Sequence, residues 1–389
     1  MKKIISILGS TGSVGINTLD VISKFPEDFA IYGLSCRENI GLLIRQIEKF
    51  NPHSVAILNE EKAIEVKKLL KGKKVEIYSG MSGLIKIAEA KEVNMVVGAL
   101  TGKNSLFPLL RAIGKGKDIA VANKEVIVGF GKILVNEAKK KKVRILPVDS
   151  EISAIFQCLE GRNIDEVKEV ILTASGGPFY RLSRMALEKV TRQEAIKHPI
   201  WKMGKKISVD SATLMNKGLE IIEASNFFGI PLSKIRVLIH PQTIIHSVVS
   251  FIDGISLAQL AIPDMRIPIQ YVLFYPKRIG TFLPSADLAK AGNLEFIHPD
   301  TKSFPCLQYA REAVVIGKGM PAVLSAADEV GVNAFLEGKI GFMDIPRVIK
   351  RVMDKYKRKC QTLKELLEAD EWARDETEKI ICSGRVNSA

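Results

Sequence analysis

Residues 3–25 read KIISILGSTGSVGINTLDVISKF, and the class of the fold can be inferred from this segment. Lys3–Leu8 is a short apolar run typical of a buried strand, Gly9–Gly15 is rich in glycine, and Ile16–Phe25 has helical spacing. Small residues let the backbone approach a phosphate, and a helix N-terminus offers it free N–H groups. The spacing is GxxGxxG rather than GxGxxG, and such a pattern alone is weak. Its position between a strand and a helix predicts a nucleotide-binding turn.

Strand-like and helical segments then alternate through residue 148. The further strands that we expect are Ala30–Cys36, Val55–Leu58, Val75–Tyr78, Met95–Val97, Asp118–Ala122 and Val143–Val148. This alternation predicts a Rossmann-like, doubly wound parallel sheet in residues 1–148.

The rest of the chain is expected to hold a central α+β domain (149–275), a linker (276–304) rich in proline and glycine, and a helical bundle (305–389). The central domain has a strand at Val167–Ala174 and a mixed sheet with strands near Arg236–His240, Ser247–Ile252 and Leu257–Ala261. Helices are expected at Cys306–Ile316, Ala322–Glu337, Asp344–Tyr356 and Leu363–Cys382. Glycines at both ends of residues 175–206 suggest a mobile flap, in which Trp201 closes over a ligand or serves only packing.

The charge and the cysteines limit the possible classes of function. The net charge of +14 suits an anionic substrate, because no basic stripe carries the interleaved aromatic residues of a nucleic-acid surface. Lysine-rich, solvated helix faces are the alternative explanation of that charge. Five cysteines without a CxxC pair indicate a reducing compartment, and no apolar run approaches a membrane span. We therefore expect a cytoplasmic enzyme that binds neither nucleic acid nor a membrane.

Asp149-Ser150-Glu151 directly follows the strand Val143–Val148. Side chains two apart on an extended chain point the same way, so Asp149 and Glu151 would converge. Carboxylates suit Mg²⁺ or Mn²⁺, which leave coordination positions open for substrate oxygens. The alternative is that Asp149 and Ser150 only cap a helix beginning near Glu151.

Asn216, Lys217 and Glu220 lie within one turn of a predicted helix, Asn216–Phe227. An amide, an ammonium and a carboxylate on one face can converge on a ligand, although a solvated pair of Lys217 with Glu220 is the alternative.

Two polar groups follow strands of the first sheet, at the edge where ligands of open sheets bind. Asn123-Lys124-Glu125 suits a substrate or nucleotide contact, or else a plain helix start. Arg37-Glu38-Asn39 lies about twenty residues beyond the glycines, where Arg37 favours the 2′-phosphate of NADP and Glu38 either repels that phosphate or points to solvent.

These motifs together resemble one family, 1-deoxy-D-xylulose 5-phosphate reductoisomerase, over nearly the full chain. The matching segments are residues 9–15 (GSTGSVG), 122–125 (ANKE), 149–151 (DSE), 174–179 (ASGGPF), 198–204 (HPIWKMG), 210–220 (DSATLMNKGLE), 240–242 (HPQ) and 263–266 (PDMR). So many motifs in one order are highly specific.

The resemblance implies a homodimeric enzyme of the non-mevalonate isoprenoid pathway that uses NADPH and one Mg²⁺ or Mn²⁺. Its reaction turns 1-deoxy-D-xylulose 5-phosphate into 2-C-methyl-D-erythritol 4-phosphate, with rearrangement of the carbon skeleton before hydride transfer. The first 148 residues would then bind NADPH, and residues 149–275 would form the catalytic and dimerisation domain.

The resemblance also implies roles for single residues. The metal ligands would be Asp149, Glu151 and Glu220, which with Lys124 form the catalytic set. The substrate would contact Lys124, Ser150, Glu151, Ser175, His198, Trp201, Ser211, Asn216, Lys217 and Glu220, with Trp201 and Met203 in the closing flap. NADPH would contact Thr11, Gly12, Ser13, Val14, Asn39, Asn123, Glu125 and Gly204, and Arg37 joins this set from its position after the second strand rather than from the resemblance.

The pair Arg37-Glu38 departs from the family's common order, in which a small residue and then a basic one precede the asparagine. One rival function is an NADP-dependent dehydrogenase of another small acidic substrate with a merely structural metal. Another rival is a basic, nucleotide-binding regulator that contacts nucleic acid, which would leave the carboxylates without a role.

Overall fold

The computed structural model describes residues 1–201 and 203–384, and these form two compact units. The first unit holds Met1–Val126, Lys132–Ser153 and Met265–Pro284, and the second holds Ile127–Gly131, Ala154–Asp264 and Ser285–Ala389. The finer division into three domains and a linker stays a prediction. Lys202 of the expected flap and residues 385–389 of the expected helical domain lie outside the described residues.

The first unit is built on a seven-stranded parallel sheet in the order β4-β3-β2-β1-β5-β6-β7. Its strands are β1 (Lys3–Leu8), β2 (Phe29–Cys36), β3 (Ser54–Ile57), β4 (Glu76–Ser79), β5 (Met95–Gly98), β6 (Asp118–Val121) and β7 (Ile145–Pro147). The doubly wound sheet expected from the alternating segments is confirmed.

The order of the strands reverses beside β1, since β2 lies on one side of it and β5 on the other. Ligands of open α/β sheets bind at the carboxyl edge of such a reversal, and Gly9–Gly15 follows β1 there. Gly9 has a φ of +92°, and a Cβ on it would lie 2.7 Å from the carbonyl oxygen of Ala99, after β5. A Cβ on Gly15 would lie 2.3 Å from the carbonyl oxygen of Gly9. These two positions therefore accept only glycine, which keeps the turn tight.

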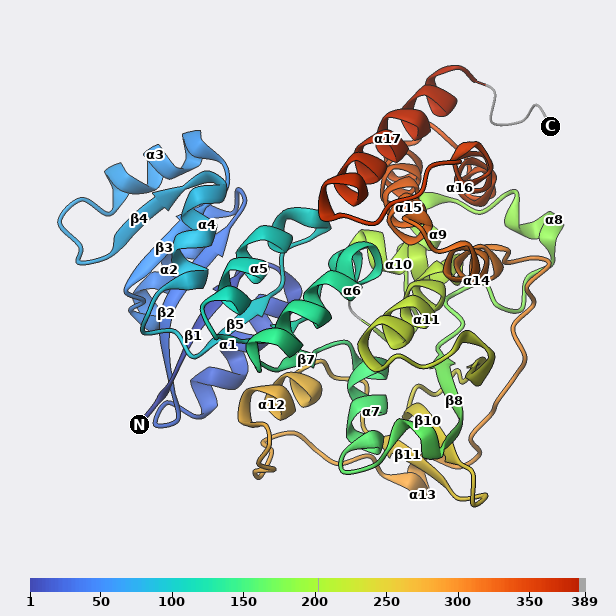
Figure 1. The fold of residues 1–389 in the computed structure, drawn as a ribbon, viewed down its shortest axis with the longest axis horizontal. Helices are drawn as coiled ribbons and strands as arrows, with labels where there is room; N and C mark the ends of the chain where they lie inside the picture. Colours follow the sequence, from blue (N-terminus) through green and yellow to red (C-terminus); the bar gives the residue numbers. More distant parts are fainter. Residues whose placement is uncertain (202, 385–389) are drawn as a thin grey trace. The chain divides into compact units, whose positions relative to one another are not determined.

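Helices follow these strands along the chain, and Figure 1 shows those between residues 13 and 114 beside the sheet. They are α1 (Ser13–Lys24), α2 (Ile40–Phe50), α3 (Glu60–Leu69), α4 (Gly80–Glu89), η1 (Gly102–Ser105), α5 (Leu106–Gly114), α6 (Lys124–Lys141) and α7 (Ser150–Leu159). A later helix, α12 (Arg266–Phe274), returns to this unit and packs on α1, with the Phe274 ring edge-on to those of Phe25 and Phe29. The sequence pattern did not predict this return.

The second unit contains a four-stranded mixed sheet in the order β11-β10-β8-β9. Its strands are β8 (Val167–Ala174), β9 (Ile235–Ile239), β10 (Ile245–Phe251) and β11 (Ser256–Leu260). β8 pairs in parallel with β9 and antiparallel with β10, so the expected mixed sheet is confirmed.

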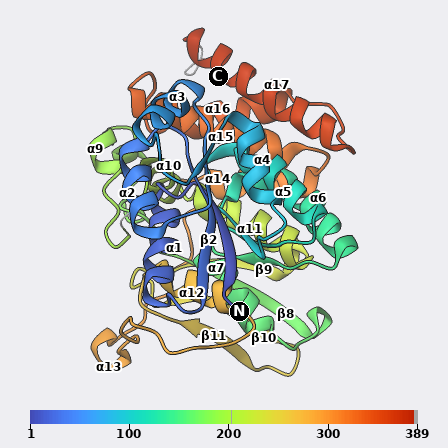
Figure 2. The same cartoon turned by 90° about the vertical axis from the view of Figure 1, so that its left-hand side faces the viewer.

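The second unit also contains the helices α11 (Met215–Phe228) and α15 (Met320–Glu337). The others are α8 (Arg184–Leu187), α9 (Arg192–Ala195), α10 (Lys205–Ala212), α13 (Leu288–Ala291), α14 (Cys306–Ile316), α16 (Asp344–Lys355) and α17 (Leu363–Cys382), with short turns η2 (Ile164–Glu166) and η3 (Leu232–Lys234). α15 packs against α14, α16 and α17 as expected for a terminal bundle, which Figure 2 shows from the side. Among the described residues, no helix has the length and apolar character needed to cross a membrane.

Candidate active site

Lys124 and Asp149 meet at the carboxyl edge of the parallel sheet. They follow the neighbouring strands β6 and β7, so the sheet brings them together. The Lys124 Nζ lies 2.6 Å from Asp149 Oδ1, and their side chains are only 8% and 14% exposed. A cation held beside a carboxylate with so little water can stabilise negative charge on a bound ligand.

The chain turns into a helix at Asp149, which corrects one expectation. Helix α7 begins at Ser150, and the carbonyl of Asp149 accepts a hydrogen bond from the Ser153 N–H at 2.7 Å. Asp149 and Glu151 therefore do not share the face of an extended strand, because Asp and Ser favour a helix start here. The alternative of a helix start is confirmed. The Ser150 hydroxyl donates to Glu151 Oε2 at 2.7 Å.

Glu220 lies one turn into α11 with its full side chain buried. Asn216 Nδ2 donates to Glu220 Oε1 at 2.7 Å, and Lys217 forms an ion pair with Glu220 Oε2. Lys217 is also buried, so the alternative of a solvated surface pair is wrong. Removing a carboxylate from water is costly unless charged and polar partners surround it, and this helix supplies both.

Carboxylate oxygens of Asp149, Glu151 and Glu220 lie within 4.8 Å of one another. Asp149 Oδ2 is buried and makes no hydrogen bond within the described part of the chain. Three oxygen donors at this spacing, one of them with a free lone pair, fit a hard divalent cation such as Mg²⁺ or Mn²⁺. The donor set thus suits the expected metal, while the assignment of these ligands stays a prediction.

Ser175, His198 and Ser211 form a second polar cluster, in the second unit. Ser175 follows β8 and Ser211 lies near the end of α10, and their hydroxyl oxygens are 3.4 Å apart. The Ser175 hydroxyl also lies 2.8 Å from His198 Nε2. Gly177 has a φ of +65°, and a Cβ there would lie 2.7 Å from the carbonyl oxygen of Ser211. The glycine turn after β8 therefore packs directly on the backbone that presents Ser211.

The ring of His198 is held as a neutral hydrogen-bond donor. Its Nδ1 accepts the backbone N–H groups of Ile200 and Trp201 at 3.2 and 2.9 Å. An accepting Nδ1 carries no proton, which assigns the proton of the neutral ring to Nε2, facing Ser175. Burial lowers the pKa of His198 to about 4. His198 thus both holds the backbone of its own turn and donates toward Ser175.

The candidate nucleotide residues after β1 and β2 remain accessible. Thr11–Val14 are exposed or half-buried, and α1 starts after Gly12 without a side-chain cap. Asn39 caps α2 by accepting from the Leu42 N–H at 3.2 Å. The Arg37 Nε lies 3.5 Å from Glu38 Oε1, with both side chains mostly exposed. This loose pair leaves Arg37 able to turn toward an anion.

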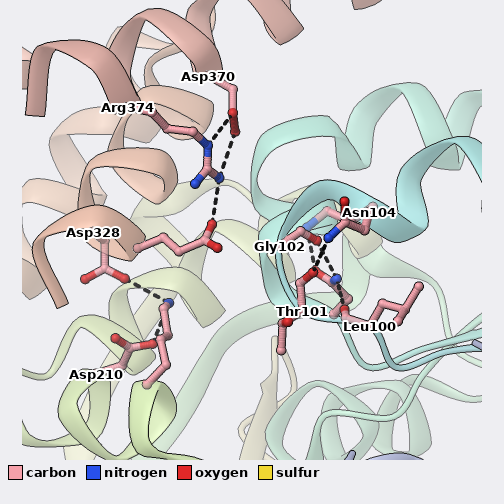
Figure 3. Close-up of polar contacts among 12 residues, drawn as sticks. Leu100, Thr101, Gly102, Asn104, Asp210, Asp328, Asp370 and Arg374 are labelled. Atoms are coloured by element: carbon pink, nitrogen blue, oxygen red, sulfur yellow. Dashed lines mark hydrogen bonds and ion pairs between the residues drawn. The ribbon is translucent and has the colours of Figure 1, made fainter. Parts of the chain in front are cut away.

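Asn123 serves the protein's own backbone. It caps α6 by accepting from the Val126 N–H at 3.0 Å, and its amide donates to the carbonyls of Leu100 and Gly102. The Leu100–Gly102 loop that it ties to α6 is drawn in Figure 3. The alternative of a helix cap is thus confirmed for Asn123, while its expected contact with NADPH stays a prediction. Glu125 lies half-buried in the first turn of α6.

The end of the expected flap leads into α10. Trp201 and Met203 are half-buried, and the Trp201 ring lies 6.2 Å from that of His246. Gly204 is exposed and occupies the N-cap position of α10. His240 is a satisfied core residue, because its Nδ1 lies 2.9 Å from the Glu295 carbonyl oxygen and its Nε2 accepts from the Ile244 N–H.

The sequence reasoning missed a buried ionic cluster of Lys206, Asp210 and Asp328 near Ser211. The four-residue spacing of Lys206 and Asp210 could have indicated an ion pair on one helix. Their pairing with Asp328 could not be inferred, because Asp328 is distant in the sequence.

Comparison with known proteins now adds to this geometry. The sequence model of 1-deoxy-D-xylulose 5-phosphate reductoisomerase matches residues 5–131, and those of its C-terminal domains match residues 145–228 and 260–376. The chain belongs to the 1-deoxy-D-xylulose 5-phosphate reductoisomerase family. Family members from Thermodesulfovibrio yellowstonii and Pelotomaculum thermopropionicum are each 48% identical to it. Both alignments cover 98% of this chain, with 100% of the first relative and 99% of the second.

Solved structures of reductoisomerases share the fold. The Zymomonas mobilis enzyme in complex with NADPH superposes with a TM-score of 0.92 at 38% identity, covering 98% of this chain and 99% of its own. A reductoisomerase in complex with NADPH, fosmidomycin and magnesium has a TM-score of 0.94 at 36% identity, with the same coverage. The architecture expected from the motifs, a Rossmann-like sheet with a catalytic region and terminal helices, is confirmed.

Proposed function

We infer that this protein converts 1-deoxy-D-xylulose 5-phosphate into 2-C-methyl-D-erythritol 4-phosphate, with NADPH as reductant and a divalent metal. This is a step of the non-mevalonate route to isoprenoid precursors. The observation that carries the inference is membership of the reductoisomerase family over nearly the whole chain. Relatives with solved structures bind NADPH, magnesium and fosmidomycin, which agrees with these cofactors.

Asp149, Glu151 and Glu220 would hold the metal in this proposal. A bound Mg²⁺ or Mn²⁺ supplies Lewis-acid stabilisation of negative charge on the ketone and the neighbouring hydroxyl of the substrate. Lys217 and Asn216 hold the Glu220 carboxylate in place, because each donates to a different oxygen of it. Lys124 does the same for Asp149 and adds positive charge beside the reacting atoms.

Ser150 and Glu151 would contact the reacting part of the substrate. The Ser150 hydroxyl is already held by Glu151 Oε2, which fixes the direction of its lone pairs. It can therefore accept a hydrogen bond from a substrate hydroxyl without first losing its own orientation.

The cluster of Ser175, His198 and Ser211, together with Asn216 and Lys217, would hold the phosphate end of the substrate. Two hydroxyls and the Nε2–H of a neutral imidazole are donors suited to phosphate oxygens. Binding energy from this remote group can drive ordering of the flap, so that Trp201 and Met203 exclude water during the reaction.

NADPH would lie along the turn Thr11–Val14, where the glycine-rich backbone and the start of α1 suit a pyrophosphate. Arg37 and Asn39 would approach the 2′-phosphate and ribose. Asn123, Glu125 and Gly204 complete the proposed cofactor contacts. We further propose a cytoplasmic homodimer, with residues 149–275 forming the catalytic and dimerisation domain.

Turnover with defined reactants tests this function. Incubation of the protein with 1-deoxy-D-xylulose 5-phosphate, NADPH and Mg²⁺ or Mn²⁺ should consume NADPH and yield the branched product, identified by mass spectrometry and NMR. Omission of the metal should abolish both readouts. Consumption of NADPH with an unbranched product would instead establish the rival function of a simple dehydrogenase.

A further inference from the structure

One lysine in the second unit is held between two buried carboxylates. The Lys206 Nζ lies 2.7 Å from Asp210 Oδ2 and 2.9 Å from Asp328 Oδ2, as Figure 3 shows for the two labelled aspartates. The side chains of Asp210 and Asp328 are 2% and 0% exposed, and that of Lys206 is 22% exposed. Two of these residues come from α10 and the third from α15, so the cluster joins two helices far apart in the sequence.

The stability of α10 does not explain these charges. Lysine in the first turn of a helix and aspartate near its end both oppose the helix dipole. Lys206 is the second residue of α10, and Asp210 precedes its last two residues. Their i,i+4 order, with the lysine first, is also the less favourable one. The cluster must therefore serve something other than the helix that carries most of it.

Because the cluster is buried, its charges add little net stability, and their main effect is on the placement of α10 against α15. Withdrawing carboxylates from water costs about as much as one ammonium returns, so apolar residues could hold α10 on α15 equally well. Buried ion pairs differ from apolar packing because a buried charge separated from its partner is costly, so a placement of α10 that keeps both pairs is favoured. The field of the two aspartates also reaches Cys306, where burial first and then these charges raise the pKa of the thiol well above its usual value.

The residue next to Asp210 is Ser211 of the proposed phosphate cluster. Ser211 lies 3.4 Å from Ser175, and its backbone is the surface against which Gly177 packs without room for a side chain. A rotation or slide of α10 would therefore displace Ser211 relative to Ser175. It would also move Gly204, the N-cap of α10, where the flap ends.

The partner helix α15 is anchored on its other side. Glu329, next to Asp328, lies 2.6 Å from Arg374 of α17, and the same guanidinium is 2.8 Å from Asp370. Figure 3 shows this second ionic group beside the first. Ion pairs thus join α17 to α15 and α15 to α10, through the sequence neighbours Glu329 and Asp328.

We propose that Lys206, Asp210 and Asp328 are positioning residues that set the placement of Ser211, and with it the affinity of the phosphate cluster. The C-terminal helices would then act on the reaction through this ionic cluster. This inference rests on the proposed function, because Ser211 is assigned there to the substrate phosphate.

The inhibition constant of inorganic phosphate, which competes with the sugar phosphate, measures the affinity of the Ser175–His198–Ser211 cluster for phosphate. Asp328→Asn keeps the shape of the side chain and removes its charge. We expect the inhibition constant for phosphate and the KM for the sugar phosphate to rise on the order of tenfold to a hundredfold, since small misplacements have such effects. The Kd for NADPH, measured by fluorescence, should change much less, because Gly204 at the start of α10 is the one proposed NADPH contact on that helix. Glu376→Gln removes a carboxylate from an ion pair of α16 with α17 and is the matched control, with no change expected in either constant.

The results of these measurements distinguish a positioning role from a merely structural one. Loss of thermal stability with an unchanged phosphate constant would overturn the proposal and leave a merely structural cluster. Absence of product with the unaltered protein would contradict the proposed function instead, whereas phosphate binding, followed by calorimetry, would still test the positioning. If Asp328→Asn does not fold, Lys206→Arg decides, because its planar fork keeps the charge but changes the geometry. An unchanged phosphate constant in that variant would refute the inference.

Discussion

The two units would bind phosphate groups in different ways. In the first, the turn Thr11–Val14 is exposed or half-buried and offers backbone at the start of α1. In the second, Ser175, His198 and Ser211 are half-buried or buried side chains that already contact one another. The first arrangement depends on glycines that no side chain can replace, and the second on contacts among side chains from the turn after β8, a loop and α10.

This difference predicts how each region responds to substitution. A backbone site loses little when one nearby side chain is removed, because its N–H groups remain in place. A network of buried side chains loses alignment when any member changes, because each partner is left unsatisfied. Substitutions in the second unit should therefore have the larger effects, and the four that follow test this ranking.

Glu220→Gln should have the largest effect. The change removes one proposed metal ligand and the charge that pairs with Lys217, without changing the shape of the side chain. We expect the loss in kcat/KM at limiting Mg²⁺ to exceed a hundredfold, since even outer-shell changes cost about ten- to a hundredfold in metal affinity. NADPH binding should be retained. Glu337→Gln makes the same change at an exposed carboxylate and should leave turnover unaltered. Unchanged activity of Glu220→Gln at limiting metal would contradict the ligand assignment.

His198→Gln should follow, with a rise in the KM for the sugar phosphate of about tenfold, typical of the loss of a buried donor. Its pH dependence is a sharper test. The pKa of His198 is lowered from 6.5 to about 4 by burial, so between these values only the unfolded chain binds the proton. The stability of the unaltered protein should therefore fall as pH drops from 6.5 to 4, and the variant should lack this component. Urea unfolding at several pH values measures it, with His53→Gln as an exposed control.

The sequence allowed most of the sheet to be predicted, because buried parallel strands are continuous apolar runs between glycines and helix starts. Val167–Ala174 matches β8 at both ends, and Cys306–Ile316 matches α14. The sequence was less informative where the chain turns sharply. Asp149 and Glu151 were expected on an extended strand, whereas α7 starts immediately after Asp149. The local sequence there is compatible with both an extended strand and a helix start, and it does not show which of the two forms.

Contacts between residues far apart in the sequence also could not be predicted. The motifs named Ser175, His198 and Ser211, but only the fold shows that they touch and that His198 is fixed as a donor by the Trp201 backbone. Asp328 had no motif at all, since its partners lie on a helix more than a hundred residues earlier. The packing of α12 on α1 in the first unit could not be predicted for the same reason.

Trp201→Ala tests the flap and should have an intermediate effect. The ring lies 6.2 Å from that of His246 and is half-buried, so its loss removes apolar cover from the proposed site. We expect kcat/KM to fall by about tenfold, consistent with lost ordering of a lid rather than lost chemistry. The chain has two tryptophans, and Trp372 in α17 packs on Tyr356. Trp372→Ala is therefore the matched control, which should lower thermal stability and leave kcat/KM unchanged. Equal kinetic constants for Trp201→Ala and the unaltered protein would show that the ring takes no part in closure.

Arg37→Ala should have the smallest effect, because exposed charges contribute little and the phosphate turn is mostly backbone. Arg37 is 71% exposed in its side chain and lies 3.5 Å from Glu38, which competes with a 2′-phosphate for the guanidinium. We expect the KM for NADPH to rise a few-fold at low salt and the difference to shrink as salt is added, since screening weakens exposed pairs. Glu38→Gln should act in the opposite direction, because it frees Arg37 for the phosphate. Neither variant should change the KM for NADH, which lacks that phosphate. If both variants changed NADH and NADPH kinetics equally, Arg37 would be serving the fold of the loop, and discrimination between the cofactors would have to come from another residue of the first unit.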